Sequence, residues 1–403
     1  MVDYASLFSR NLPRSVATPE GAGAQVKYIF SVTNAVPEVI DADEYLTAIA
    51  SGLAGGGAAS LAGYPPAGGH VGLRELIAQR LASNRGFNTS PDDVFIADGA
   101  GGSITILLDS FINPGDPVLV EEFTYMGSLR MMMERGAEPI HVPSDDDGML
   151  PDAVEDILSS LNTAGRRAKF IWTIPVFQNP LGYTVSEARR NALLDAAERW
   201  GVPILENESY ADFRIDGDPL PPAMSGMRDN ADVMYVSSFT KLLGCGLRVG
   251  FGVLPPAVKA ALPLANAQNL PRRNASHLAT MLVYEYMRDH EAEHIEAVRK
   301  ALLVRRDAML EALTANFPAF CEWTEPQGGM MIFVRLPEGA DTWSTLVKAT
   351  QRDVKYNPGG MFRSDRDRNN HFRLTYSHNS PTEIHEGIAR LAELFREEGY
   401  FEG

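Results

Sequence analysis

Short apolar runs alternate with helical patterns through the middle of the chain, from about residue 73 to residue 255. Six runs have the length and the bounding turn residues of buried strands: Val94–Ala97, Pro117–Val120, Lys169–Thr173, Val202–Leu205, Val233–Ser237 and Val249–Val253. Amphipathic spacing between them predicts helices at Gly72–Asn84, Ser103–Ile112, Gly127–Arg135 and Ser186–Trp200. This alternation indicates an α/β protein whose mostly parallel central sheet is flanked by helices. Such sheets bind ligands beyond the carboxyl ends of their strands, so the loops after these runs are candidates for chemistry.

The pattern changes toward the end of the chain. A long charged helical stretch, Ala275–Phe317, precedes short strand-like runs at Met330–Arg335, Val354–Tyr356 and Phe372–Tyr376. This texture predicts a smaller α+β domain.

The length of 403 residues suits two domains, at roughly 100 to 200 residues per domain. We predict a large domain over residues 55–290 and a small domain formed by both chain ends, residues 1–54 and 291–403. The glycine-rich stretch 51–60 is either a flexible connection or a mobile flap over the site.

The composition of the chain mainly excludes certain classes of protein and of binding partner. The chain has 36 Lys and Arg against 52 Asp and Glu, a net charge of −16, which argues against nucleic-acid and anionic-membrane partners. No stretch approaches the roughly 18 apolar residues that span a bilayer, and the start of the chain lacks the apolar core of a secretory leader. Two cysteines, Cys245 and Cys321, form neither a disulfide framework nor a four-ligand zinc site. We therefore expect a cytoplasmic protein without a metal.

The most informative segment for chemistry is SSFTKLLGCGLRVGF, residues 237–251. It places Ser238, Thr240 and Lys241 directly after a predicted strand, with Arg248 seven residues beyond the lysine. Two hydroxyls and a guanidinium suit a phosphate dianion, and a neighbouring amine can hold an aldehyde as a Schiff base. Pyridoxal phosphate carries both groups. A lysine after a strand, taken alone, is more often simply solvated.

Three further segments follow predicted strands. They are Asp98-Gly-Ala-Gly-Gly-Ser103, VEEFTYMG at residues 120–127 and PVFQNPLG at residues 175–182. The glycine-rich loop is weak evidence alone, an aromatic after a strand is more often a core residue, and a bare Asn-Pro is only a turn signal, so the third segment is informative only as a run of eight residues.

Taken together and in this order, the motifs resemble the fold-type I, class I/II aminotransferases, especially the 2-aminoadipate aminotransferase-like branch. The resemblance runs from about residue 28 to residue 398. It implies pyridoxal 5'-phosphate as cofactor, with Lys241 as its Schiff base and proton shuttle. The other cofactor contacts implied are Ser238, Thr240 and Arg248 with the amides of Ala100 and Gly101 at the phosphate, Tyr125 stacked on the ring, and Asn179 at the phenolic oxygen.

The resemblance also implies substrate and partner contacts. Arg373, in NNHFRLTYS, takes the position of the arginine that binds the α-carboxylate of the amino acid. Asn179 lies beside the same substrate. Tyr64 has the spacing of the tyrosine that reaches the phosphate in the neighbouring subunit, which implies a homodimer. Arg272, next to Arg273, is a candidate for a distal carboxylate or phosphate of the substrate, although a surface charge at the entry to a helix is the more common explanation of such a pair.

One position departs from the family pattern D-x-x-Y. Tyr210 matches the tyrosine near the phenolic oxygen, but Asn207 stands where an aspartate faces the pyridine nitrogen. A neutral amide stabilises a pyridinium less well than a carboxylate does. Glu206 or Glu208 could substitute, yet alternation along a strand sends both to the opposite face. A local shift in register is the other way to restore a carboxylate.

We therefore predict an aminotransferase that acts on an amino acid and a 2-oxo acid. The alternative, motivated by Asn207, is a pyridoxal-phosphate-dependent elimination, replacement, cyclisation or oxidation of an amino acid. A more remote alternative is a non-catalytic cofactor or amino-acid sensor.

His290 and His294 match the zinc-protease string H-E-x-x-H, but their charged surroundings on a predicted helix argue against a metal site.

Overall fold

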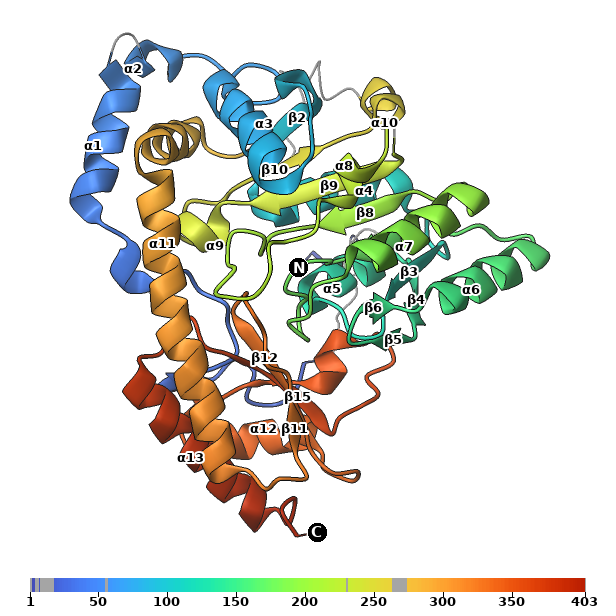
Figure 1. Cartoon of the computed structure of the whole chain (residues 1–403), viewed down its shortest axis with the longest axis vertical. Coiled ribbons are helices and arrows are strands. Elements are labelled where there is room, and N and C mark those ends of the chain that lie inside the picture. Colours follow the sequence, from blue (N-terminus) through green and yellow to red (C-terminus); the bar gives the residue numbers. More distant parts are fainter. Residues whose placement is uncertain are drawn as a thin grey trace.

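The computed structural model describes residues 2–3, 7, 18–54, 57–229, 231–262 and 274–402. Its centre is a seven-stranded sheet (Figure 1) in the order β2-β10-β9-β8-β7-β3-β4. The strands are β2 (Val94–Asp98), β3 (Pro117–Glu121), β4 (Glu138–Val142), β7 (Ile171–Thr173), β8 (Ile204–Asn207), β9 (Val233–Ser238) and β10 (Val249–Val253). Only β10 runs antiparallel to its neighbours among these strands. The mostly parallel sheet predicted from the apolar runs is confirmed.

The helices that cover this sheet lie on both of its faces. They are α3 (Val71–Arg85), α4 (Gly99–Phe111), α5 (Met126–Glu134), α6 (Pro151–Thr163) and α7 (Glu187–Trp200). Side chains of β3 alternate between two cores, because successive residues of a strand point to opposite faces. Val118 and Val120 pack in the core that contains Leu107 of α4, whereas Leu119 packs in the core that contains Leu158 of α6 and Leu193 of α7.

Shorter elements connect these layers. They are the hairpin β5 (Ser144–Asp145) and β6 (Gly148–Met149), the helices α8 (Met224–Met227), α9 (Thr240–Leu243) and α10 (Pro256–Ala261), and the 3-10 turns η2 (Pro37–Val39) and η4 (Pro91–Asp93).

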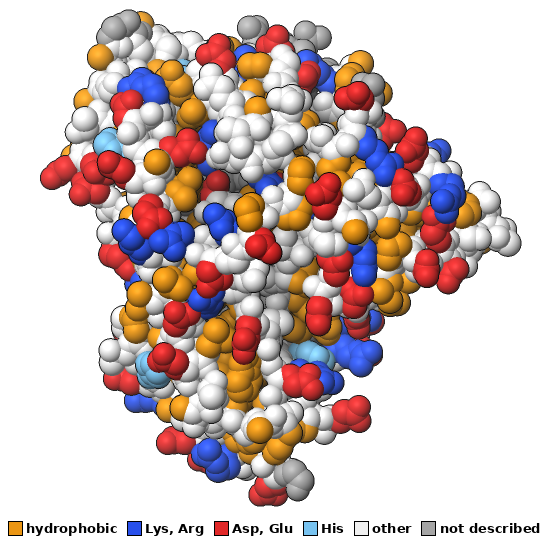
Figure 2. All heavy atoms as spheres, in the orientation of Figure 1, with side chains coloured by type: hydrophobic (Ala, Val, Ile, Leu, Met, Phe, Trp, Pro, Cys, Tyr) orange, Lys and Arg blue, Asp and Glu red, His pale blue; other side chains and the backbone are white. Residues whose placement is uncertain are grey.

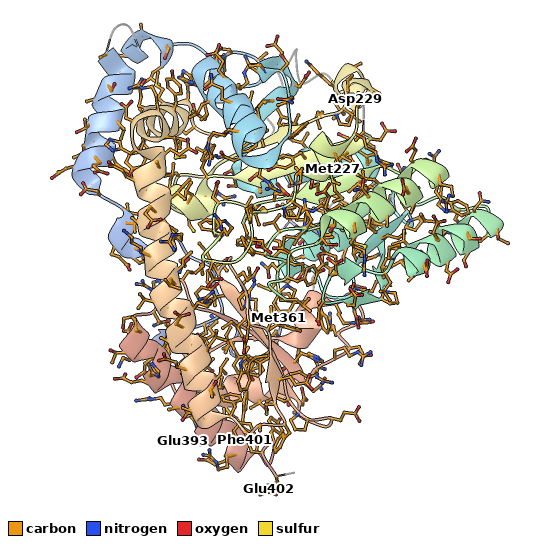
Figure 3. All side chains as sticks on the ribbon, in the orientation of Figure 1. Met227, Asp229, Met361, Glu393, Phe401 and Glu402 are labelled. Carbon is orange, nitrogen blue, oxygen red and sulfur yellow. The ribbon has the colours of Figure 1, made fainter. Side chains whose placement is uncertain are left out.

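A second, antiparallel sheet forms the C-terminal part of the molecule. Its order is β11-β12-β15-β14, with β11 (Glu322–Trp323), β12 (Met331–Arg335), β14 (Asn357–Pro358) and β15 (His371–Thr375). Around it lie α12 (Thr342–Gln351), the turn η6 (Gly359–Phe362) and α13 (Pro381–Glu397). Met361 of η6 lies where the two parts of the molecule meet, while Phe401 and Glu402 lie at the far end (Figure 3).

The two ends of the chain meet in this second part. Strand β1 (Tyr28–Ile29) pairs in parallel with β13 (Val354–Lys355). Helix α11 (His277–Asn316), 40 residues long, runs past both parts, with α1 (Ala42–Leu53) beside its first half and α13 beside its second (Figure 1). The division at residues 54/55 and 290/291 stays a prediction, and residue 290 lies within α11.

The glycine-rich stretch 51–60 is partly helical. Its first residues close α1, residues 57–60 form α2 (Gly57–Ser60), and residues 55 and 56 lie outside the described residues. Whether it acts as a flap stays a prediction. Within the described residues, no helix combines the length and the apolar character that crossing a membrane requires.

His371 of β15 gives the second sheet a testable dependence on pH. Its ring stacks on Phe333, and burial, followed by the charges of Arg335 and Arg368, lowers its pKa from 6.5 to about 4. Between these values the unfolded chain binds the extra proton, so this residue stabilises the fold more as pH rises from 4 to 6.5. The difference amounts to about 3 kcal/mol at most.

His371→Phe keeps the aromatic packing and removes the titration. Thermal unfolding at pH 4.5 and pH 7 is expected to show a smaller loss of stability at low pH in this variant than in the wild type. Equal losses in the two proteins would show that His371 is not held neutral.

Candidate active site

A cup of donors lies where β9 ends and α4 begins. Thr240 N donates to Ser238 Oγ at 2.9 Å, and the two hydroxyl oxygens lie 2.7 Å apart. The guanidinium of Arg248 donates from Nε to Asp98 Oδ1 at 3.0 Å and from Nη2 to Asp98 O at 3.2 Å, and remains half exposed. These residues were predicted together, and the structure brings them together.

Glycines allow the backbone to close around this cup. A Cβ on Gly99, at φ +63°, would lie 3.0 Å from Arg248 Nη2 and 3.2 Å from Thr240 Oγ1. A Cβ on Gly250 of β10 would lie 2.2 Å from the carbonyl carbon of Gly99. The first turn of α4, with Ala100 and Gly101, receives no side-chain cap from Asp98, so its amides suit an anion.

Lys241 lies on the one-turn helix α9 that follows the cup. Its Nζ donates to the carbonyl oxygen of Thr33 at 2.5 Å, and Cys245 Sγ lies 3.8 Å from the same nitrogen. The segment before α1 therefore crosses Lys241. The sequence carries no signal for this contact, because a backbone carbonyl has no residue signature.

Asn179, Tyr210 and Arg373 form a hydrogen-bonded chain. Asn179 Nδ2 donates to the hydroxyl of Tyr210 at 3.1 Å, and Arg373 Nη1 donates to Asn179 Oδ1 at 2.9 Å. Arg373 Nη2 donates to the carbonyl of Ser31 at 2.6 Å. The three side chains come from the loop after β7, the loop after β8 and strand β15, so both sheets contribute to one site.

Arg373 is a buried cation that has no counter-anion among the described residues. It is 2% exposed, no described carboxylate pairs with it, and its Nε has no hydrogen-bond partner among the described residues. Burial lowers its pKa to about 10, opposed by the nearby hydroxyls of Tyr210 and Tyr125. Because burying an unpaired charge is costly, this arrangement favours a ligand that brings a carboxylate.

The hydroxyl of Tyr125 lies near the positively charged side chains of this site. Burial raises the pKa of its hydroxyl, and the positive charges of Lys241, Arg373 and Arg248 act in the opposite direction. Tyr125 thus lies close enough to interact electrostatically with the donor cup and with the guanidinium of Arg373, which we call the carboxylate seat.

Asn207 ends β8 with its side chain 4% exposed. Its Oδ1 accepts from Ser209 Oγ at 2.6 Å and from Ser209 N at 3.1 Å. A backbone N–H only donates, so the amide oxygen faces Ser209 and Nδ2 is the group left to meet a ligand.

Neither neighbouring glutamate substitutes for the missing aspartate. Arg85 binds Glu208 through Nε and Nη2, both at 2.7 Å, and Arg190 Nη1 lies 3.2 Å from Glu208 and 3.7 Å from Glu206. Burial, followed by the charge of Glu208, raises the pKa of Glu206 to about 7. The alternation predicted along the strand holds, and β8 shows no register shift that returns a carboxylate to the position of Asn207.

Glu121 is an organising residue that the sequence did not single out. It is 1% exposed and accepts hydrogen bonds from Thr173 Oγ1 and Ile174 N on one oxygen and from Thr124 Oγ1 and Gln178 Nε2 on the other. These four donors tie the loop that carries Tyr125 to the loop that carries Asn179. A glutamate at the end of an apolar run gives no signal of such a role.

Of the other predicted residues, Tyr64 is not brought to the site in this chain, and Arg272 cannot be placed. The side chain of Tyr64 is 89% exposed, with no described contact to the donor cup. Arg272 and Arg273 lie outside the described residues.

On the face shown in Figure 2, basic side chains are interspersed with acidic ones rather than gathered over one element, so the cup is a local feature of an acidic protein.

The residues present fit pyridoxal phosphate. The hydroxyls of Ser238 and Thr240, the guanidinium of Arg248 and the uncapped start of α4 suit its phosphate. Lys241 supplies an amine for its aldehyde, and the paired Asn179 and Tyr210 supply donors for its phenolic oxygen.

Comparisons with known proteins agree with this chemistry. The sequence matches the family Aminotransferase class I and II over residues 33–391. Aromatic-amino-acid aminotransferase 1 of Thermococcus litoralis is 34% identical over 331 residues, which cover 82% of this chain and 79% of that protein.

Solved structures agree as well. A multiple substrate aminotransferase from Thermococcus profundus has a TM-score of 0.90 at 30% identity and covers 99% of both chains. The α-aminoadipate aminotransferase LysN of Thermus thermophilus, complexed with N-(5'-phosphopyridoxyl)-L-leucine, has a TM-score of 0.87 at 28% identity and covers 98% of this chain and 99% of its own. They confirm the fold-type I architecture predicted from the motifs. The chain belongs to the class I and II aminotransferases and is a pyridoxal-phosphate-dependent transferase.

Proposed function

We propose that the protein transfers the amino group of an L-amino acid to a 2-oxo acid, with Lys241 as the residue that bonds the cofactor and Arg373 as the seat of the substrate α-carboxylate. The observation that carries the proposal is the buried, unpaired guanidinium of Arg373, joined through Asn179 to Tyr210. Bound pyridoxal phosphate supplies the electron sink for this chemistry.

The protein side chains divide the remaining work. Arg373 holds the carboxylate so that the α-carbon lies near Lys241, and the amine of Lys241 accepts and returns the α-proton. Asn179 and Tyr210 hold the phenolic oxygen, and the donor cup holds the phosphate. Ala100 and Gly101 contribute amides, and the ring of Tyr125 covers one face of the cofactor.

Asn207 sets this site apart from the family pattern. Its Nδ2 is a neutral donor, so it does not stabilise a protonated ring nitrogen as a carboxylate does. Elimination, replacement, cyclisation or oxidation as the main reaction, and a sensor role, are not favoured, because the relatives compared above are named as aminotransferases. Their names also place aromatic amino acids and 2-aminoadipate first among the substrates to test.

We further propose a homodimer in which Tyr64 contributes to the site of the second copy. Exposed apolar side chains occur on α1, in the segment that follows α2, and at the start of α3 and α11. They are Leu46, Leu61, Tyr64, Val71 and Leu278. Contact with a second copy would cover them, since soluble monomers rarely expose extended apolar patches.

Arg272 is proposed as a contact for a distal acidic group of the substrate. The free thiols of Cys245 and Cys321 suit a cytoplasmic location.

The proposal is tested with matched pairs of substrates. Wild-type protein loaded with pyridoxal phosphate is given L-phenylalanine or L-2-aminoadipate with 2-oxoglutarate, and in parallel the same side chains as amines that lack the α-carboxylate. We expect the amino acids to react at least about 100-fold faster in kcat/KM, because the amines leave Arg373 unpaired. Equal rates for acids and amines would overturn the role of the carboxylate seat.

A further inference from the structure

The helix that carries Lys241 is held from behind by side chains far away in the sequence. Helix α9 has one turn, and the amides of Leu242 and Leu243 both donate to the carbonyl of Phe239. The chain leaves the helix at Gly244, so the carbonyls of its last residues have no partner within the helix. His294 Nε2 lies 2.8 Å from Leu242 O, and the hydroxyl of Tyr45 donates to Leu243 O at 2.5 Å.

These two donors belong to a partly buried cluster between α1 and α11, which we name the α9 clamp: Glu44, Tyr45, Tyr286 and His294. The hydroxyl of Tyr286 lies 3.0 Å from His294 Nδ1 and 3.0 Å from Glu44 Oε2. The ring of Tyr286 meets that of Tyr45 edge-on at 4.9 Å. His294 is 4% exposed and Tyr286 is 2% exposed, so these two side chains lie in the interior, whereas Glu44 and Tyr45 are half-buried at its edge.

The chemistry of the contacts fixes the direction of donation. A carbonyl oxygen only accepts, so Nε2 of His294 carries a hydrogen and donates it to Leu242. Both ring nitrogens of His294 are therefore engaged. The second histidine of the H-E-x-x-H string thus caps a helix.

We propose that His294 and Tyr45 are positioning residues that set the direction of the Lys241 side chain. Both bond the carbonyls directly after Lys241, so they fix the rotation of the single turn from which its amine extends. The buried side chains of Leu242 and Leu243 also anchor the turn by packing, but among the described residues its other side-chain hydrogen bonds lie on the N-terminal side, at Ser238 and Thr240. An amine displaced by about 1 Å bonds the cofactor less well and moves protons more slowly. This inference rests on the proposed function of Lys241.

The test compares His294→Leu, which removes the donor, with His294→Gln, whose amide N–H reaches a similar distance. His290→Leu is the matched control, since His290 lies one turn earlier on α11 and stacks on Tyr286 at 5.0 Å without a bond to α9. The first readout is the apparent Kd for pyridoxal phosphate, followed by visible absorbance. We expect His294→Leu to raise it about 2- to 10-fold, the equivalent of one net hydrogen bond. His294→Gln and His290→Leu should stay close to wild type.

A second background separates positioning of the amine from general loosening. In Lys241→Ala protein, which binds the cofactor without a covalent bond, adding His294→Leu is expected to leave the Kd unchanged. A further rise in that background would show that His294 supports the phosphate cup instead. In the single variant, kcat should fall about 10- to 100-fold while KM for the amino acid stays within about twofold.

The outcomes are distinguishable. If wild-type protein forms no covalent bond with pyridoxal phosphate, the proposed function fails. If it does, and His294→Leu matches wild type in Kd and kcat, or His294→Gln is as impaired as His294→Leu, the positioning role fails. Should His294→Leu not fold, Tyr45→Phe removes a single hydroxyl and is judged by the same measurements.

Discussion

Lys241→Ala protein is expected to bind pyridoxal phosphate without forming a covalent bond to it. Its rate of amino transfer should fall about 100- to 10,000-fold below that of the wild type, because the group that moves the α-proton is lost. The phosphate cup and the Asn179–Tyr210 pair remain, so binding of the cofactor should weaken without disappearing. The absorbance band that arises from the covalent bond between the cofactor and the amine of Lys241 should be absent from this variant. Absorbance spectra and single-turnover rates with an amino acid measure both effects.

Lys259→Ala is the matched control for this change. Lys259 lies on α10, about one-third exposed, and pairs with Asp93 at 2.7 Å, away from the donor cup. This variant should keep the covalent bond and the wild-type rate. Borohydride reduction of the loaded wild type, followed by peptide mass analysis, should place the cofactor on the peptide that contains Lys241. A cofactor found on another lysine would contradict the assignment.

The second large effect is expected at Arg373. Replacing it by glutamine should lower kcat/KM for amino acids by about 30- to 5,000-fold, the equivalent of the roughly 2 to 5 kcal/mol lost when one partner of a buried charge pair is removed. Arg373→Lys should recover only part of this, because an ammonium does not match a carboxylate with two parallel hydrogen bonds. Steady-state kinetics with amino acids give the measurement.

Two controls separate carboxylate binding from folding. Arg335→Gln removes an exposed arginine of β12 that pairs with Glu322, and it should leave the kinetics unchanged. Amines without a carboxylate should react equally slowly with the wild type and with Arg373→Gln. If amino acids and amines lost the same factor in Arg373→Gln protein, the guanidinium would be supporting the site without binding substrate.

The sequence predicted the parts of this site that lie in contiguous motifs. The segment from Ser238 to Arg248 forms the donor cup because a strand, a turn and the next strand bring its ends together within one short stretch. The same holds for the loops that present Tyr125 and Asn179. The central sheet followed from its apolar runs, whereas the edge strand β4 was missed because its residues Glu138–Val142 are largely half-exposed and form no apolar run.

The parts that sequence reasoning missed depend on contacts between distant elements. Thr33 and Ser31 contribute backbone carbonyls to Lys241 and Arg373, and a carbonyl leaves no mark in the sequence. The alternation rule predicted that Glu206 and Glu208 point away from Asn207. It gave no information about their partners, Arg85 of α3 and Arg190 of α7, which are distant in the sequence. From the sequence, no metal site was predicted at His294, and nothing indicated its bond to α9, which depends on the crossing of α11 behind Lys241.

Transfer of labelled nitrogen tests the central claim most directly. Wild-type protein loaded with pyridoxal phosphate is incubated with a 15N-labelled L-amino acid and unlabelled 2-oxoglutarate, and the products are separated by mass. Amino transfer predicts one labelled glutamate for each 2-oxo acid formed from the donor. Formation of the 2-oxo acid with the label released as ammonia, and none in glutamate, would contradict the account.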